Sequence, residues 1–474
     1  MKRIAVIGAD VSGLATLKSL EEEGLDAVAF DRRPTIGGLW NFTRETGDQT
    51  PAYPGLSMNT SRQISGFSDF PYPSHPHYYP QREQVLAYVN AYAKAFDLFP
   101  KIQLNTEILR MQQKPDGRWR VTCRHRHKRQ NQEFDAVVVC TGRHLYPNRP
   151  IFPNEHDFLG HIVHSITYVD PEVYRDQNIL IIGSGASAAD LAVQISRVAR
   201  SVYVSVKQGR WIVPRFIGGK PVDFRLTRLS YHLPKPLQYF ALYRAFMKEM
   251  QRLGFREGGR EYGLPSPNFD LRSIRLTLNT DFLYAVKAGS ITIKPELKTF
   301  TSDGVTFVDG SNQKIDTVIS ATGYAVKLPF FPDMKLLTDM QDLNLFKYVF
   351  PPDIANLAFV GMMNVQGPFL PVYEMQARWV AASLSNRKRL PSQDTMQREI
   401  AARQAYLRSK KKRPAIVPYY SYMEALAAQI DVRPRIRRHP DLWFSLWLKP
   451  VSGLQYRLDG PHAWNGAHRA LKLL

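Results

Sequence analysis

The sequence predicts an α/β protein with two Rossmann-like dinucleotide-binding domains, the second inserted into the first. Two short apolar strands, at residues 3–7 and 178–182, each run into a glycine-bearing turn and a helix, and another strand follows each helix. Uninterrupted apolar runs of this length are typical of strands buried on both faces of a parallel sheet. Two such strand–helix–strand openings predict two nucleotide-type folds in one chain.

The first opening leads into loops and then into a strand-rich segment. After the turn GADVSG and its helix, the strand DAVAFD ends at Asp31. Residues 41–80 are rich in Pro, Tyr, Ser and Asn, which predicts long, ordered loops. A helix is expected over residues 82–98. Residues 108–142 predict a strand, a Pro-Asp-Gly turn, a strand, a basic loop and a buried strand that runs into Thr141-Gly142.

The second opening is followed by an insertion. Its strand NILIIG, helix GSGASAADLAVQISRVA and strand SVYVSV precede an irregular segment at about 212–275 with a few helical patches. SITIKP and VTFVDG are predicted to be hairpin-like strands, and KIDTVISATGY a buried strand that runs into a glycine turn. After about Leu328 the chain returns to loop-rich material, with the strand LAFVGMM and the helix VYEMQARWVAASLSN. The last stretch is expected to be irregular.

The composition predicts a soluble, reduced, cytoplasmic protein without a metal. Of the 474 residues 44% are hydrophobic and 22% charged, which excludes a largely disordered chain. The two cysteines, Cys123 and Cys140, are too few for a disulfide framework or a zinc site. No apolar run approaches the ~20 residues that a membrane helix needs, so no transmembrane anchor is expected. Asp10 interrupts the apolar stretch near the start, which favours a strand and turn over a signal peptide.

The chain is strongly basic. Lys and Arg number 63 against 42 Asp and Glu, a formal net charge of +21. Basic clusters lie far apart, at residues 124–129, 410–413 and 433–438, and no nucleic-acid-binding signature accompanies them. We therefore expect solvated faces and no nucleic-acid partner. Contact with an anionic membrane surface and a homodimer stay open.

The second glycine turn predicts a dinucleotide site. Gly183, Gly185 and Ala188 fit the G-x-G-x-x-G/A fingerprint, in which the glycines allow a tight turn and close approach of a pyrophosphate to a helix N-terminus. Lys207 and Arg210 follow the next strand in place of an acid. Positive charge there favours a 2′-phosphate, and hence NADPH over NADH. The alternative, that both are solvated surface residues, stays open.

The first glycine turn departs from the fingerprint. Gly8 and Gly13 occupy the outer positions, but Asp10 stands where the second glycine belongs. A carboxylate there would add bulk and negative charge beside a pyrophosphate. Asp31, at the end of the next strand, is still placed to accept hydrogen bonds from ribose hydroxyls. The turn predicts either a dinucleotide site with one displaced turn or a unit that binds a dinucleotide poorly or not at all.

Further motifs resemble those of the flavin-containing monooxygenase family. Phe158, Gly160, His164 and Tyr168 match that family's pattern F-x-G-x-x-x-H-x-x-x-(Y/F), whereas the related Baeyer–Villiger monooxygenases typically end it with Trp. GGLW, MNTSRQISGFSDFPYP, ATGY, FVGMMNVQGPFLPVYEMQARW and YRLDGPHAW also look like family motifs, in family order. The resemblance runs from residue 4 to about 465 and departs at Asp10, where the family has glycine.

The resemblance implies FAD on the first Rossmann-like unit and NADPH on the second. It implies an FAD-binding domain of residues 1–170 and 326–474, the latter including a C-terminal segment, around an NADPH-binding domain of residues 171–325. By motif position, the residues that would contact FAD are Gly8, Ala9, Ser12, Gly13, Asp31, Gly38, Leu39, Trp40, Asn59 and Thr60. Those that would lie near NADP are Gly183, Gly185, Ser187, Ala188, Asp190 and Lys207, with Asn59. The linker turns, also cofactor contacts, would be Thr141, Gly142, Thr322 and Gly323.

The resemblance also implies a reaction. Members oxygenate soft nucleophiles, at an amine nitrogen or a sulfide sulfur, with NADPH and O2 through a C4a-hydroperoxyflavin. The catalytic residue would be Asn59, because an amide can donate and accept hydrogen bonds without offering a labile proton to the peroxide. We expect His164 to be structural. Baeyer–Villiger oxygenation of a ketone, an NADPH oxidase that releases peroxide, and a non-catalytic member in which Asp10 impairs FAD binding remain alternatives.

Overall fold

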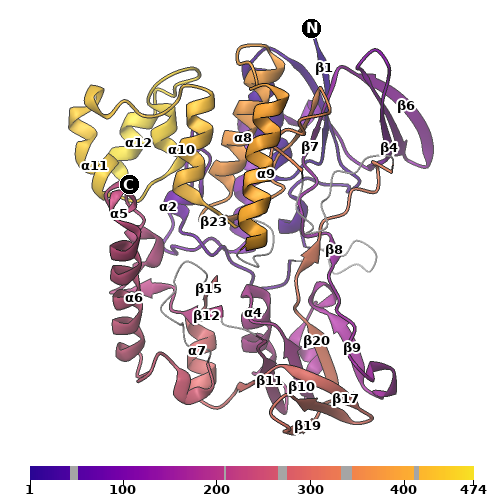
Figure 1. The fold of residues 1–474 in the computed structure, drawn as a ribbon, viewed down its shortest axis with the longest axis vertical. Helices are drawn as coiled ribbons and strands as arrows, with labels where there is room; N and C mark the ends of the chain where they lie inside the picture. Colours follow the sequence, from indigo (N-terminus) through magenta and orange to yellow (C-terminus); the bar gives the residue numbers. More distant parts are fainter. Residues whose placement is uncertain (43–51, 208–209, 265–274, 333–343, 410–415) are drawn as a thin grey trace. The chain divides into compact units, whose positions relative to one another are not determined.

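The computed structural model describes residues 1–42, 52–207, 210–264, 275–332, 344–409 and 416–474 (Figure 1). They divide into two compact units. Unit 1 comprises Met1–Asn41, Thr60–Tyr146 and Ala325–Leu474, and unit 2 comprises Phe42–Asn59 and Pro147–Tyr324. The short strands β8 (Tyr146–Pro147) and β21 (Tyr324–Ala325) stand where the chain passes from one unit to the other. The domain boundaries predicted at residues 170 and 325 separate an FAD-binding domain from an NADPH-binding domain, and this division by ligand stays a prediction.

A five-stranded parallel sheet lies at the centre of unit 1. Its strand order is β22-β7-β1-β2-β3, and all neighbouring strands run parallel. The strands are Arg3–Ile7 (β1), Asp26–Phe30 (β2), Ile102–Gln103 (β3), Ala136–Val139 (β7) and Leu357–Phe359 (β22). β1 is the middle strand and has a parallel partner on each side. The turn that follows it therefore lies in the middle of the carboxyl edge of the sheet, where ligands bind in folds of this kind.

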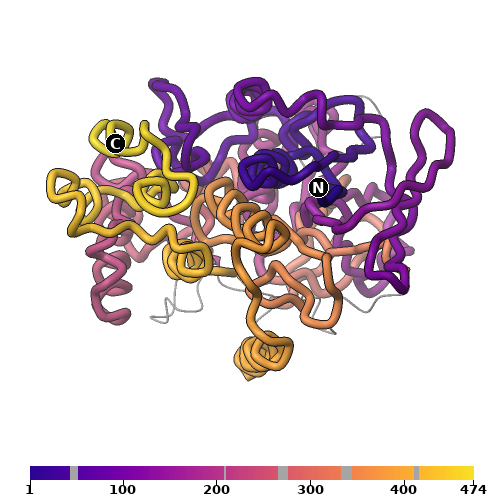
Figure 2. The backbone as a smooth tube through the Cα atoms, turned by 90° about the horizontal axis from the view of Figure 1, so that it is seen from above, coloured from indigo at the N-terminus to yellow at the C-terminus, as the bar shows by residue number. Residues whose placement is uncertain are grey.

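Two helices pack together in unit 1. The helix α1 (Val11–Glu22) contacts β1 and β2 and lies alongside α8 (Leu370–Leu384), as the view in Figure 2 shows. Every residue of α1 from Val11 to Leu20 is buried, because the sheet covers one side and α8 another. The helix that begins at the first glycine turn is therefore held rigidly at its place on the sheet.

A three-stranded antiparallel sheet corrects one expectation. The predicted basic loop near residues 124–129 is a hairpin, in which β5 (Trp119–His125) pairs with β6 (Lys128–Phe134) and only Arg126 and His127 turn. Both turn residues have positive φ. The sequence signal failed because β6 carries almost no apolar residues, and its backbone ladder to β5 alone defines it as a strand. The third strand is β4 (Thr106–Gln113).

The C-terminal part of unit 1 is helical rather than irregular. Its helices are α9 (Gln393–Ser409), α10 (Tyr419–Gln429), α11 (Trp443–Leu448) and α12 (Ala467–Leu473). The last two are too short to show a clear apolar period, and they depend on a small shared core of Leu442, Leu446, Leu454 and Leu471. The remaining elements of unit 1 are α2 (Arg62–Ser65), α3 (Arg82–Ala95), β23 (Asn364–Gln366) and β24 (Ile416–Pro418). Among the helices described, none is long and apolar enough to cross a membrane.

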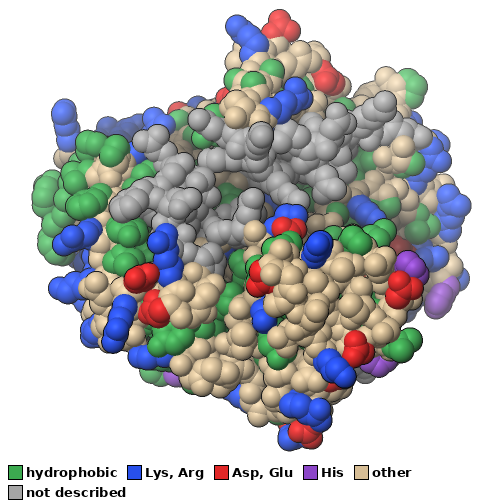
Figure 3. All heavy atoms as spheres, turned by 60° about the horizontal axis from the view of Figure 1, so that its bottom comes forward, with side chains coloured by type: hydrophobic (Ala, Val, Ile, Leu, Met, Phe, Trp, Pro, Cys, Tyr) green, Lys and Arg blue, Asp and Glu red, His purple; other side chains and the backbone are tan. Residues whose placement is uncertain are grey.

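The basic charge is spread over the surface. On the face drawn in Figure 3, Lys and Arg side chains stand among acidic and apolar ones. The basic residues predicted at 124–129 and 433–438 are exposed, and some are paired: Arg124 with Glu107, and Arg433 with Glu424 at 3.5 Å. These two clusters are solvated, as the sequence predicts. The cluster at 410–413 lies outside the described residues.

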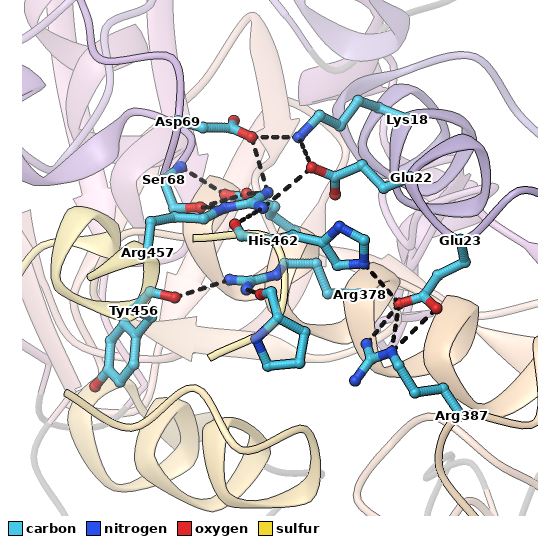
Figure 4. Close-up of polar contacts among 12 residues, drawn as sticks. Lys18, Glu22, Glu23, Ser68, Asp69, Arg378, Arg387, Tyr456, Arg457 and His462 are labelled. Carbon is cyan, nitrogen blue, oxygen red and sulfur yellow. Dashed lines mark hydrogen bonds and ion pairs between the residues drawn. The ribbon is translucent and has the colours of Figure 1, made fainter. Parts of the chain in front are cut away.

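A buried ion network joins both ends of the chain within unit 1 (Figure 4). The Arg457 side chain is 1% exposed; its Nη2 lies 2.8 Å from Asp69 Oδ2 and 2.9 Å from Glu374 Oε1. Its Nη1 lies 3.1 Å from Glu22 of α1, and Lys18 pairs with both Glu22 and Asp69. Buried charges are tolerated only when they are paired, so this network holds the C-terminal segment on α1 and α8.

Unit 2 contains a second five-stranded parallel sheet, as the second opening predicts. Its order is β16-β11-β10-β20-β9. The strands are His161–His164 (β9), Asn178–Ile182 (β10), Ser201–Ser205 (β11), Thr292–Lys294 (β16) and Thr317–Ser320 (β20). The helix α4 (Ala186–Ile195) follows β10, and α7 (Thr280–Lys287) packs against α4.

The insertion at 212–275 is more regular than expected. It contains α5 (Arg228–His232) and the 18-residue helix α6 (Lys235–Arg252). Phe246 and Met250, which lie four residues apart on α6, are fully buried. This spacing is typical of the buried face of a helix, but the helix was not predicted from the sequence. The insertion also contains β12 (Arg210–Val213), paired with β15 (Arg275–Leu278), and the pair β13 (Phe216–Ile217) and β14 (Lys220–Pro221).

The predicted hairpin of SITIKP and VTFVDG is wrong in its pairing. The strand within SITIKP is β16, which joins the edge of the parallel sheet beside β11. VTFVDG forms β18 (Gly304–Phe307), which pairs instead with β17 (Leu297–Thr301) and β19 (Asn312–Lys314). Pro295 separates β16 from β17 and lacks the N–H that a continuous ladder would require.

Candidate functional site

The glycine turn of unit 1 is built by two close backbone contacts. Gly8 has φ +111°, and a β-carbon there would stand 2.6 Å from the carbonyl oxygen of Cys140. A β-carbon on Gly13 would stand 1.9 Å from the carbonyl oxygen of Gly8. Both positions therefore require glycine, one for the turn and the other for the packing of α1 on the strand.

Unit 2 repeats the construction. Gly183 has φ +134°, and its β-carbon would stand 2.6 Å from the carbonyl oxygen of Ala321. In each unit the residue approached is followed by a Thr-Gly pair, Thr141-Gly142 after β7 and Thr322-Gly323 after β20, and both of these glycines have positive φ. The predicted linker turns thus lie beside the two glycine turns at the carboxyl edges of the sheets.

Asp31 organises the first turn. The N–H of Ala9 donates to Asp31 Oδ2 at 2.8 Å, and the N–H of Arg33 donates to Oδ1 at 3.0 Å. A carboxylate oxygen can accept two hydrogen bonds, so each keeps capacity for a ribose hydroxyl. Ser12, at the start of α1, donates from Oγ to the carbonyl oxygen of Cys140 at 3.2 Å.

Asp10, expected to add bulk and negative charge at the first turn, has its carboxyl packed against a neighbouring segment. Its carboxyl turns toward the segment at Gly38, whose added β-carbon would stand 2.4 Å from Asp10 Cγ. Oδ1 is shielded from solvent and has no hydrogen-bond partner among the described residues. Burial raises the pKa of this carboxyl to about 7, an effect that the backbone amides of Val11 and Leu39 partly offset. The group is therefore close to half-protonated at neutral pH.

The segment Gly38–Trp40 forms a short 3-10 helix, η1, beside Asp10. Arg33 Nη1 donates to the carbonyl oxygen of Gly38. Trp40 is buried and stacks on Phe369 with an interplanar angle of 3°. Its Nε1 is a second buried polar atom with no partner among the residues described. Leu39, which lies between Gly38 and Trp40 in the sequence, is half-buried.

The residues of unit 1 fit an anionic dinucleotide such as FAD. Two glycines shape the turn at the start of a 12-residue helix, whose N-terminal N–H groups favour phosphate. Two polar atoms of this region, Asp10 Oδ1 and Trp40 Nε1, are buried and have no hydrogen-bond partner among the described residues. Buried polar groups in native proteins are nearly always paired, so both atoms are free to bond to a ligand with hydrogen-bonding groups.

Asp190, predicted to lie near NADP, is engaged by protein groups. Tyr53 donates to Oδ2 at 2.7 Å and Asn279 donates to Oδ1 at 2.6 Å, with Arg215 Nη2 at 3.8 Å. Burial raises the pKa of Asp190. Asp190 therefore ties α4 to Tyr53, far before it in the sequence, and to Asn279, far after it. On the same helix Ala188 is fully buried and Ser187 is half-buried.

The two predicted cations of unit 2 differ in position. Lys207 is 74% exposed and pairs with Glu296 at 2.6 Å. Arg210 lies at the glycine turn: a β-carbon on Gly185 would stand 3.9 Å from its Cζ. Gly185 is also the N-cap residue of α4. The guanidinium and the helix N-terminus together fit the phosphates of a dinucleotide such as NADPH.

Asn59 and Thr60 lie where the chain passes from unit 2 to unit 1. Asn59 is exposed, and Thr60 Oγ1 lies 2.7 Å from Ser65 Oγ. The segment before Asn59 is anchored in unit 2, because Arg215 Nη1 donates to Ser57 Oγ at 2.7 Å. The amide of Asn59 is thus presented to solvent from an anchored loop.

His164 is a structural residue of unit 2. It is 6% exposed, its Nδ1 accepts from the N–H of Ile166 at 3.2 Å, and its Nε2 lies 3.1 Å from the carbonyl oxygen of Gly323. Burial lowers the pKa of His164, in keeping with a neutral ring that donates from Nε2. Thr322 also donates to the carbonyl oxygen of Asn148. The end of β9 thus supports the turn after β20.

Sequence reasoning missed four residues that shape these turns: Arg33, Tyr53, Arg215 and Asn279. Arg33 holds Gly38, and the other three surround Asp190. The Arg-Arg pair after Asp31 could have drawn attention to Arg33. No local pattern marks Tyr53 or Asn279, because each meets Asp190 only through the tertiary fold.

The sequence and the fold resemble those of known proteins. Residues 1–473 match the family described as FMO-like, flavin-binding monooxygenase-like. The chain is 36% identical to flavin-containing monooxygenase 5 of Cavia porcellus and 34% identical to dimethylaniline monooxygenase [N-oxide-forming] 2 of Oryctolagus cuniculus, in both cases over 99% of this chain and 91% of the relative. Its fold matches that of S-allyl-L-cysteine S-oxygenase from Allium sativum with a TM-score of 0.68 and 25% identity, over 90% of this chain and 88% of that one.

Proposed function

Because the chain belongs to the flavin-binding monooxygenase-like family, we propose that unit 1 binds FAD and unit 2 binds NADPH in an enzyme that oxygenates a small molecule with O2. The chain is a flavin monooxygenase that acts on nitrogen or sulfur nucleophiles. The observation that supports two separate dinucleotide sites is the repeated turn, in which a β-carbon on Gly8 or on Gly183 would stand 2.6 Å from the carbonyl oxygen of Cys140 or of Ala321. Each unit thus has its own dinucleotide turn.

We assign the FAD contacts to the first turn and its neighbours. The domain that supplies them would comprise residues 1–170 and 326–474. Asp31 is placed to accept from ribose, Trp40 Nε1 to donate, and the N-terminus of α1 to face the diphosphate. Gly8, Ala9, Ser12, Gly13, Gly38, Leu39, Thr60, Thr141 and Gly142 complete the proposed set.

We assign the NADPH contacts to the second turn, in a domain of residues 171–325. Gly183, Gly185, Ser187, Thr322 and Gly323 line the turn and its neighbour, and Arg210 supplies the positive charge beside it. Arg210 replaces Lys207 as the favoured phosphate ligand, because its guanidinium lies beside Gly185, whereas Lys207 is 74% exposed and reaches Glu296. Asp190 would act by holding the loop that ends at Asn59, since Tyr53 in that loop donates to it.

The chain's own residues position and shelter the reaction. FAD, once bound and reduced, supplies the oxygen chemistry. Asn59 would act on the reacting oxygen through an amide that holds hydrogen bonds and offers no readily lost proton. Tyr168, where Baeyer–Villiger enzymes typically have Trp, favours nitrogen or sulfur oxygenation over ketone oxygenation; it is buried and donates to Gln194 at 2.9 Å, so it would act through packing.

We further propose a cytoplasmic location, with transient contact to an anionic membrane surface. Cys123 and Cys140 are free and buried, as suits a reducing compartment. Trp443 and Phe444 on α11 are exposed by 53% and 59%, and Arg437 and Arg438 precede them. Exposed aromatic residues next to cations favour binding at a lipid surface. The homodimer stays a proposal, to be tested by the mass of the protein in solution.

The visible spectrum of the purified protein, with and without added FAD and then with anaerobic NADPH, tests the proposal. Flavin bands that NADPH bleaches are expected. Aerobic turnover with N,N-dimethylaniline, S-allyl-L-cysteine and cyclohexanone as probes should then yield an N-oxide or sulfoxide and no lactone. A protein that binds no flavin would refute the enzyme assignment, and a lactone as main product would refute the substrate class.

A further inference from the structure

We propose that Asp10 is a proton-dependent FAD-binding residue: as a neutral carboxylic acid it donates a hydrogen bond from Oδ1 to the FAD diphosphate. The inference rests on the proposed function, because it places FAD at the turn after β1. Asp10 occupies the position of the second glycine in the fingerprint of this turn.

The position of Asp10 carries the argument. It is the N-cap residue of α1, but its side chain makes no cap hydrogen bond to that helix. The carboxyl instead packs on Gly38, a position with φ +47° where only glycine leaves room for it. Oδ1 is buried and has no partner among the described residues. A buried polar atom without a protein partner at a phosphate-binding turn can be satisfied by a hydrogen bond to the ligand.

The surroundings determine which form of the carboxyl fits the ligand. Burial raises the pKa of Asp10 to about 7; Asp31 raises it further, while the amides of Val11 and Leu39 and the charge of Arg33 lower it. On the side of α8, Tyr373 interacts electrostatically with Asp10 and with Arg143. The ionised carboxylate would place a third negative charge beside the two charges of the diphosphate. The protonated carboxyl can instead donate a hydrogen bond from Oδ1 to a diphosphate oxygen, since Oδ1 has no partner among the described protein groups.

Proton linkage follows from this arrangement. A ligand that binds only the protonated form must lose affinity as the pH rises through the pKa of the free protein, by up to about tenfold per pH unit. By the same reciprocity, bound FAD raises the pKa of Asp10, so binding above neutral pH takes up a proton. Family members with glycine at this position have no such group.

The experiment measures the dissociation constant of FAD for the deflavinated protein from about pH 6 to about pH 9, by quenching of flavin fluorescence at constant ionic strength. Wild type should lose affinity above about pH 7, by about tenfold or more over this range. Asp10→Asn keeps the shape and a donor without the charge and should bind with a nearly constant Kd. Asp10→Gly should also be independent of pH but bind about tenfold more weakly than Asp10→Asn, because it lacks the donor.

Three outcomes would overturn the inference: a wild-type Kd that does not change with pH, a pH dependence that persists in Asp10→Asn, or Asp10→Gly binding at least as tightly as Asp10→Asn. The exposed Asp26, at the start of β2, supplies the matched control Asp26→Asn, which should reproduce the wild-type profile. The rate of flavin release from the holoenzyme over the same pH range provides a readout that needs no reconstitution. A protein without flavin at any pH would instead refute the proposed function.

Discussion

The carboxyl of Asp10 lies directly against the α-carbon of Gly38, so that a β-carbon at residue 38 would stand 2.4 Å from Asp10 Cγ. The two residues are neighbours only in the fold, one at the end of the first glycine turn and the other in η1. The acid that breaks the glycine fingerprint is thus accommodated by a glycine 28 positions later.

A double-mutant cycle tests this accommodation. Gly38→Ala in the wild type adds a clash with Asp10 to the strain of a positive φ, whereas in Asp10→Gly it adds only the strain, about 1 kcal/mol. We expect the substitution to lower the free energy of unfolding by clearly more in the wild type, measured by urea denaturation. Equal effects in both backgrounds would show that the two side chains do not meet. Gly310→Ala, with φ +84° and no neighbour within 4 Å, is the control for strain alone.

The stability of the FAD-free protein should depend on the protonation of Asp10. Its pKa in the folded protein, about 7, is above the ordinary value of 3.8 because of burial. The folded state therefore holds this proton more tightly, and the resulting stabilisation, full below the ordinary pKa, is lost as the pH rises through about 7. The melting temperature of Asp10→Asn minus that of wild type should increase from about pH 5 to about pH 8 and then level off. A difference in melting temperature that stays constant from about pH 5 to about pH 8 would contradict this linkage.

Replacing Asn59 should separate NADPH oxidation from oxygen transfer. We expect Asn59→Ala to keep NADPH oxidation within about threefold of wild type while most of the oxygen consumed is released as hydrogen peroxide, because the hydrogen-bonding amide is lost. Peroxide and oxygenated product are measured per NADPH consumed. The exposed Asn90 of α3 offers the control Asn90→Ala, which should leave the ratio unchanged. Retained product yield in Asn59→Ala would remove the role assigned to this residue.

Arg210 and Lys207 should contribute unequally to the use of NADPH. Arg210→Ala removes the guanidinium beside Gly185 and should raise the KM for NADPH about tenfold with little change in kcat. Lys207→Ala removes an exposed side chain paired with Glu296 and should change KM by less than about twofold. Steady-state kinetics with NADPH and NADH measures both. The reverse ranking would return the phosphate contact to Lys207.

The buried network around Arg457 should be costly to break. Arg457→Met removes the guanidinium that Asp69 and Glu374 share; Asp69 keeps Lys18, but Glu374 loses its buried cation, and the free energy of unfolding should fall by about 3–5 kcal/mol. Adding Glu374→Gln should recover part of that loss, because one uncompensated charge is removed. Arg175→Ala breaks an exposed pair with Glu172 and should change stability by less than about 1 kcal/mol. Chemical denaturation that ranks Arg457→Met with Arg175→Ala would contradict the importance of the network.

The two parallel sheets and the turns that open them can be predicted from the amino-acid sequence. Residues 4–7 and 179–181 are apolar and buried, as in strands covered on both faces, and each strand is followed by a glycine that its close backbone neighbour requires. These signals are local, because strand, turn and helix follow one another within residues 3–22 and within residues 178–195. The ordered motifs from the first strand to the C-terminal YRLDGPHAW segment also sufficed to identify the family.

The partners of the polar residues follow from the tertiary fold and have no local pattern in the sequence. The charge on Asp10 depends on its burial against Gly38, the engagement of Asp190 on Tyr53 and Asn279, and the pairing of Arg457 on residues almost 400 positions away. The strand β6 and the helix α12 were missed for a related reason, since a ladder to β5 and a small shared leucine core define them rather than a pattern of their own. Apolar periodicity is written along the chain, whereas desolvation and charge compensation depend on which distant segments the fold brings together.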